Sequence, residues 1–66
     1  MAKFLVNFSN GKQVLIGAKS VEESVELASN LIGGMPLRRV QDGAPYDLTI
    51  IEINEKKIRN YAYNAH

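Results

Sequence analysis

The stretch covering residues 20–34 most constrains the fold, because it is the one segment with a helical apolar period. Ser20 is a favoured helix N-cap, and Glu23 follows at the spacing of a reciprocal capping box. Gly33 and Gly34 can take the left-handed conformation that ends helices, and a proline soon afterwards prevents the helix from resuming. The sequence therefore predicts one helix over residues 20–32.

This helix is amphipathic. Its apolar residues recur at spacings of three and four, so one face can be buried against another element. That face consists of Val21, Val25, Ala28 and Ile32, with Ser24 and Leu31 widening the stripe and Leu27 at its margin. The opposite face is polar and carries Glu22, Glu23 and Glu26. We expect this helix to cover one side of a sheet.

Residues 3–8 and 13–16 read as two strands joined by a hairpin loop. A two-residue turn at Asn10-Gly11 would scatter the apolar side chains over both faces. A three-residue loop, with Gly11 as a left-handed bulge, gathers them on one face and is preferred because it buries more. This register predicts a floor beneath the helix formed by Phe4, Val6, Phe8, Val14 and Ile16.

The second half of the chain reads as three further strands, at residues 37–41, 46–53 and 58–63, with a turn at 42–45. The apolar phase changes between Ile50 and Ile51, as expected of a bulge or of a strand buried on both sides. A four-residue loop at 54–57 predicts four cross-strand pairs: Ile53 with Ile58, Glu52 with Arg59, Ile50 with Tyr61, and Leu48 with Tyr63. Residues 64–66 are expected to fray.

The element order β-β-α-β-β-β predicts a single α+β domain over residues 1–66. It consists of one antiparallel sheet of four to five strands with the helix on one face. The pattern leaves the strand order open. The other face of the sheet is expected to lack a cover and to carry Leu5, Leu15 and some of Tyr46, Tyr61 and Tyr63.

The residue types argue against an enzyme and against a bound cofactor or metal. The chain has no Cys, and its one His is the final residue, His66. The carboxylates match no calcium-loop spacing, and Glu52 with Asp47 is more typical of a solvated surface than of an acid–base pair. Gly33-Gly34 lacks the Lys and Ser/Thr of a phosphate-binding loop.

A chain of 66 residues with a net charge of +1 is expected to form one small, marginally stable domain, for which oligomerisation would help. It has no apolar run of the roughly 20 residues that a membrane span needs. Its N-terminus also lacks the features of a signal peptide. We expect a soluble, unprocessed cytoplasmic protein.

The leading functional hypothesis is a small non-enzymatic interaction module that docks through the uncovered face on a protein partner or on a second copy, as a homodimer. The small size is typical of inhibitors, adaptors and the accessory proteins of phages and mobile elements. Tyr and Arg are enriched at interfaces, and a half-bare apolar sheet face is a liability unless it is covered. The candidate partner-binding residues are Tyr46, Tyr61, Tyr63, Arg59, Arg38, Arg39 and Leu15.

The alternative hypothesis is a single-stranded nucleic-acid-binding protein. Arg59, Tyr61 and Tyr63 alternate on one face of a strand, so bases could stack on the tyrosines while basic side chains meet phosphates. A near-neutral net charge and an acidic helix argue against this alternative.

Overall fold

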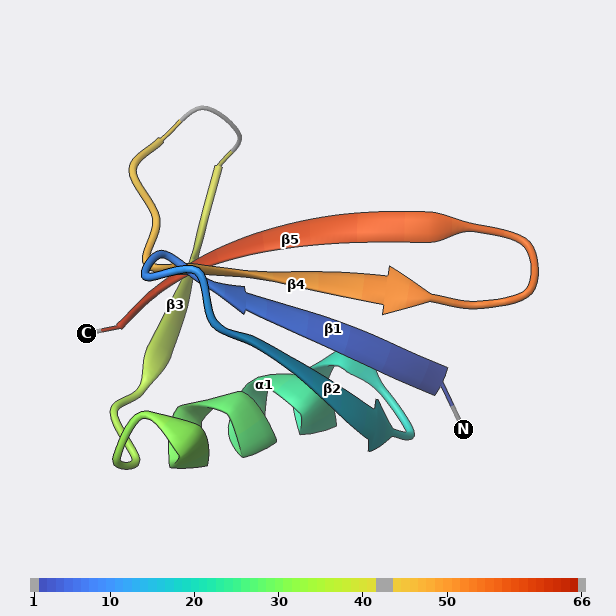
Figure 1. Ribbon diagram of the computed structural model, residues 1–66, viewed down its shortest axis with the longest axis horizontal. Coiled ribbons are helices and arrows are strands. Elements are labelled where there is room, and N and C mark those ends of the chain that lie inside the picture. Colours follow the sequence, from blue (N-terminus) through green and yellow to red (C-terminus); the bar gives the residue numbers. More distant parts are fainter. Residues whose placement is uncertain (1, 42–43, 66) are drawn as a thin grey trace.

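The computed structural model describes residues 2–41 and 44–65, and it has the predicted element order β-β-α-β-β-β. The strands are β1 (Ala2–Phe8), β2 (Gln13–Ala18), β3 (Leu37–Val40), β4 (Leu48–Ile53) and β5 (Ile58–Ala65), and the helix is α1 (Val21–Leu31). All neighbouring strands are antiparallel, in the order β2-β1-β4-β5-β3 (Figure 1). The predicted α+β class is therefore confirmed.

The β1–β2 hairpin has the predicted three-residue loop. Phe4 pairs with Ile16, and the Phe8 amide donates to the Lys12 carbonyl at 2.8 Å. Gly11 has a φ of 92°, the left-handed conformation that a bulge at this position requires. The hairpin register follows from this loop.

The helix begins and ends as its capping residues predict. The Glu23 amide donates to the Ser20 hydroxyl at 3.2 Å, while the Glu23 carboxylate accepts from the Lys19 amide rather than from Ser20 itself. At the other end, the Gly34 amide donates to the Ser29 carbonyl and the Gly33 amide to Asn30, which is the Schellman arrangement. Both glycines have positive φ.

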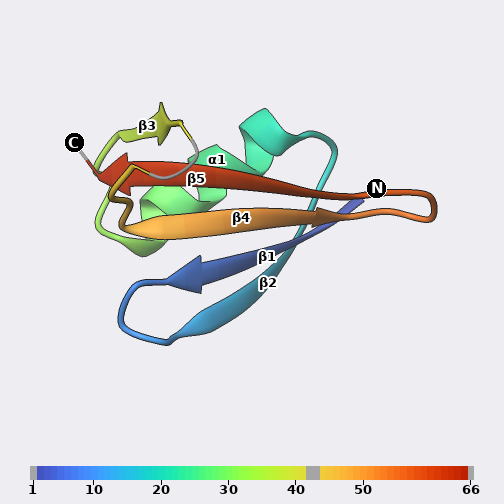
Figure 2. The same ribbon diagram turned by 90° about the horizontal axis from the view of Figure 1, so that it is seen from above.

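The core lies between α1 and one side of the sheet. The predicted floor is confirmed, since Phe4, Val6 and Ile16 are buried and the side chains of Phe8 and Val14 pack against them. The remaining buried core residues are Ala18, Ala28, Leu48, Ile50 and Tyr63. In Figure 2 the strands lie in front of α1, so the side of the sheet that faces the reader is not covered by this helix.

Several strand ends differ from the expected ones, and the largest differences are in the second half of the chain and at the end of β2, which continues to Ala18. The strand predicted at 46–53 begins at Leu48, and the last strand continues to Ala65 instead of fraying after Tyr63. Asn64 and Ala65 are held because they pair with Arg38 and Leu37 of β3. The expected turn residues Asp42 and Gly43, and His66, lie outside the described residues.

Candidate protein-binding face

The uncovered side of the sheet carries a row of aliphatic side chains across three strands. Successive residues of a strand point to opposite faces, so Leu5, which lies between the core residues Phe4 and Val6, points away from α1. Leu5 pairs with Leu15 of β2 on one side and with Ile51 of β4 on the other. The three side chains therefore lie next to one another on the uncovered face.

A second row continues this surface toward the β4–β5 turn. Ile53 pairs with Ile58 of β5 and follows Ile51 on the same face of β4. The exposed fractions are 59% for Leu15, 41% for Ile53 and 70% for Ile58. We call the five side chains the aliphatic face: Leu5, Leu15, Ile51, Ile53 and Ile58.

The other end of the uncovered side is partly closed by the chain itself. The Asn64 side-chain amide donates to the Pro45 carbonyl at 3.0 Å, and the Asp47 carboxylate accepts from the Ala65 amide at 2.9 Å. These bonds hold the segment before β4 against the end of β5. Tyr46, a predicted partner-binding residue, belongs to this segment and is exposed.

The charges on the uncovered side are basic. Among the described strand residues directed to this side, the charged ones are Lys3 and Arg38, and none is acidic. Of the three acidic residues of α1, Glu22 and Glu26 are exposed and Glu23 is partly buried. The two sides of the sheet therefore differ in charge, and only one of them is covered by α1.

Tyr61 and Tyr63 do not lie on the uncovered face, contrary to the sequence prediction. Their predicted partners Ile50 and Leu48 are confirmed. However, β4 lies next to β1, and Ile50 pairs with Val6 on the helix side of the sheet. The tyrosines opposite Ile50 and Leu48 must share that side, and only 7% of Tyr63 is exposed.

Tyr61 belongs to a polar cluster on the helix side. The Arg39 guanidinium lies 5.0 Å from the centre of the Tyr61 ring, and the Tyr61 hydroxyl donates to the Glu52 carboxylate at 3.2 Å. Arg59 pairs with Glu52 across the β4–β5 ladder, so it is on this side too. The predicted binding residues thus divide between two surfaces, with Arg39, Arg59 and the tyrosines of β5 on one and Leu15 and Arg38 on the other.

The environment of Tyr63 is typical of a core residue with a polar tip. Burial raises the pKa of its phenol above the usual 10.0, while the nearby Arg39 guanidinium acts in the opposite direction. Tyr61 and Glu22 add smaller contributions that raise the pKa further. Tyr63 therefore stabilises the fold and is not available as a stacking platform for a base.

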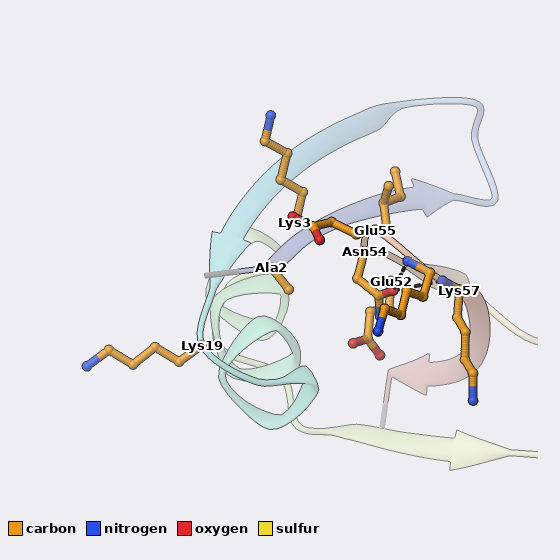
Figure 3. Close-up of a pocket in the computed structure, with 9 residues that line it drawn as sticks. Ala2, Lys3, Lys19, Glu52, Asn54, Glu55 and Lys57 are labelled. Carbon is orange, nitrogen blue, oxygen red and sulfur yellow. Dashed lines mark hydrogen bonds between the residues drawn. The ribbon is translucent and has the colours of Figure 1, made fainter.

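An open hollow lies beside the aliphatic face, between the start of β1 and the β4–β5 turn (Figure 3). It is lined by Ala2, Lys3, Lys19, Glu52, Ile53, Asn54, Glu55, Lys56 and Lys57. Figure 3 shows Lys3, Lys19 and Lys57 pointing in different directions, so their charges do not converge on one ligand. The Asn54 side chain accepts from the Lys56 and Lys57 amides and thereby fixes the turn.

The two carboxylates weighed as an acid–base pair in the sequence do not come together. Asp47 and Glu52 stand at opposite ends of β4, about 16 Å apart along an extended strand. Across residues 2–41 and 44–65, no three His, Asp or Glu side chains are grouped so that they could hold a metal ion. In the same residues, no helix is long and apolar enough to span a membrane.

The aliphatic face includes four residues that were not singled out from the sequence as partner-binding: Leu5, which was expected on the uncovered face, and Ile51, Ile53 and Ile58. The available signal was the change of apolar phase at Ile50-Ile51. The β4 ladders run without interruption on both sides, so this change marks a strand that is apolar on both faces and not a bulge.

Comparisons with family models, with curated proteins and with solved structures find no match for this chain.

Proposed function

We propose that this protein is a small non-enzymatic interaction module that binds a protein partner through its aliphatic face. The observation that carries the proposal is the alignment of Leu15, Leu5 and Ile51 across three strands, extended by the exposed side chains of Ile53 and Ile58. Contiguous apolar surface of this kind is uncommon on a protein that has no partner.

Burial of this face by a partner would contribute favourable free energy to binding. Removing an aliphatic side chain from water contributes about 1.5–3 kcal/mol when burial is complete, and proportionally less for a side chain that is already half-covered. Leu15 and Ile58 are the most exposed members, so they gain most from a partner. They are expected to contribute most to the free energy of binding.

The charges near the face indicate the kind of partner. Lys3 lies beside Leu5 and Ile53, and no acidic strand residue among those described shares this side. The best complement is an apolar patch on a folded protein that has acidic groups at its rim.

The nucleic-acid alternative has less support. Its stacking residues lie on the helix side, where Tyr63 is buried and Tyr61 is already in contact with Arg39. Arg38 and Arg39, as neighbours in one strand, point to opposite faces and do not form one phosphate-binding surface.

The test is affinity capture from the native host with nuclease-treated lysate, using the parent protein and the double variant Ile53→Thr/Ile58→Thr. Threonine keeps the β-branched shape that a strand favours but removes apolar surface. We expect the double variant to fold and to lose a specific protein partner. The matched control is Met35→Thr, which removes an exposed apolar side chain after α1 and should retain the partner.

The proposal is contradicted if the double variant captures the same proteins as the parent, or if the parent captures none specifically. A fluorescence titration with single-stranded oligonucleotides at low salt provides the second arm. Salt-dependent binding that is lost in Arg38→Ala/Arg39→Ala would support the nucleic-acid alternative instead.

A further inference from the structure

The two outer strands of the sheet differ in how they are protected from pairing with another chain. Edge strands are usually kept short or interrupted by charges and proline. β3 has four residues, includes two arginines and follows Pro36. β2 has six residues, Gln13-Val-Leu-Ile-Gly-Ala18, with no charge and no proline.

A further open stretch of edge, residues 58–61 of β5, is beyond the end of β3 and is protected by charge. It contains Arg59 and comes directly after Lys56 and Lys57. β2 is thus the edge of the sheet that combines length with an apolar, uncharged sequence.

The hairpin register shows which backbone groups β2 presents at this edge. Residues of an antiparallel ladder alternate between pairs that exchange hydrogen bonds and pairs that do not. The bond between the Phe8 amide and the Lys12 carbonyl places that pair in the bonded set. Counting in twos along the register, the β2 residues that bond to β1 are Val14, Ile16 and Ala18.

The intervening residues Gln13, Leu15 and Gly17 therefore direct their amide and carbonyl groups away from β1. A second β2 strand could pair with all three in one register. If Leu15 lies opposite Leu15 of a second copy, Gln13 lies opposite Gly17, and each pair exchanges two hydrogen bonds.

The side chains are complementary in the same register. On the uncovered side, Leu15 meets its own copy, and on the helix side Val14 meets Ile16. Lys12, the nearest charged residue, lies opposite Ala18, so no like charges face each other across the strands. We propose that two copies of this protein pair antiparallel through β2, about a twofold axis beside Leu15.

The helix supplies a second contact at the same edge. The Ser29 hydroxyl donates to the Met35 carbonyl at 2.6 Å, so the Ser29 flank of α1 faces the chain that leads to β3. Leu27 and Leu31 are each two residues from Ser29, about 200° around the helix, and so lie on the other flank. They are 39% and 54% exposed, and α1 packs against β2 and β1. Across the twofold axis these leucines approach their own copies.

Pairing through β2 joins the two sheets and places both uncovered sides on the same side of the dimer. The row Ile51, Leu5 and Leu15 then continues directly into the same row of the second copy. The pairing is inferred from the edge strand β2 alone and does not rest on the proposed function. A dimer of this kind would double the area of the proposed binding face.

The experiment introduces a positive or a negative charge at the twofold axis. Leu15→Lys and Leu15→Glu are prepared separately and mixed, and mass is measured by sedimentation or light scattering. We expect the parent to have the mass of two chains and each variant alone that of one, because like charges then lie directly opposite. The equimolar mixture should recover the dimer.

Two further variants serve as controls. Ile58→Lys places a charge on the same face but on a different strand, and it should remain a dimer while losing the protein partner. Gln13→Pro removes an amide that points away from β1, so the hairpin bonds remain and the dimer is lost. Circular dichroism establishes that each variant is folded.

Self-pairing is overturned if the parent has the mass of one chain at the highest soluble concentration, if Leu15→Lys stays dimeric, or if the mixture fails to recover. It is also overturned if Ile58→Lys alone becomes monomeric, since that assigns the contact to the sheet face. A monomeric parent combined with loss of the partner in Ile58→Lys would remove this inference and leave the proposed function in place.

Discussion

Ile50 and Ile51 are neighbours in β4, and their side chains lie on opposite sides of the sheet. Ile50 points toward α1 and is fully buried, whereas Ile51 points to the uncovered side and is only partly buried. Both are isoleucines in the same strand, bonded to the same neighbouring strands β1 and β5. The role of an apolar residue in a small sheet therefore depends on the side of the sheet to which its side chain points.

The largest loss of stability is expected from a substitution on the buried side of β4. Ile50→Ala removes a fully buried side chain and should lower the free energy of unfolding by about 2–5 kcal/mol. Ile51→Ala should cost about 1 kcal/mol, since part of that side chain is already hydrated. Urea denaturation of both variants measures the difference, and equal losses would show that the uncovered side is part of the core.

A smaller effect is expected at the start of the helix that covers one side. Ser20→Ala removes the hydroxyl that accepts from the Glu23 amide, and it should destabilise the protein by about 1 kcal/mol. Ser20→Asp restores an acceptor and adds a favourable charge at the helix N-terminus, so its stability should match the parent's. Thermal unfolding separates these outcomes, and an unchanged midpoint in Ser20→Ala would show that the cap is not needed.

The smallest effect at neutral pH is expected for the Tyr63 hydroxyl. Because burial raises the pKa of Tyr63 in the folded chain, the unfolded chain loses this proton first as the pH rises above 10.0. Stability should therefore fall through the alkaline range until the folded pKa is passed. In Tyr63→Phe this fall should be shallower, as measured by urea denaturation at several pH values. An identical alkaline fall in both proteins would contradict the assignment.

Local signals in the sequence predicted the local structure correctly. Ser20, Glu23 and the glycine pair determine the helix ends through nearby hydrogen bonds. Gly11 and the loop of residues 54–57 determine two hairpin registers, including the pairing of Leu48 with Tyr63. Each of these depends on residues close together in the chain.

The side on which Tyr61 and Tyr63 lie depends on a contact between distant strands and was predicted wrongly. The pairing of β1 with β4 places Ile50 beside Val6 on the helix side of the sheet. The tyrosines lie on the same side because Tyr61 pairs with Ile50 and Tyr63 with Leu48. The order of Asn64 and Ala65 likewise depends on β3, which is far away in the sequence. No short-range pattern reports such pairings.

We propose that the aliphatic face is the surface that a protein partner covers. The most direct measurement is methyl NMR of the protein with and without its captured partner. The account predicts that partner binding shifts the methyl signals of Ile53, Ile58 and Leu15 and shields them from a soluble paramagnetic probe, while Ile16 and Val6 stay unchanged. Shielding confined to α1, with Ile53 and Ile58 still open to the probe, would contradict it.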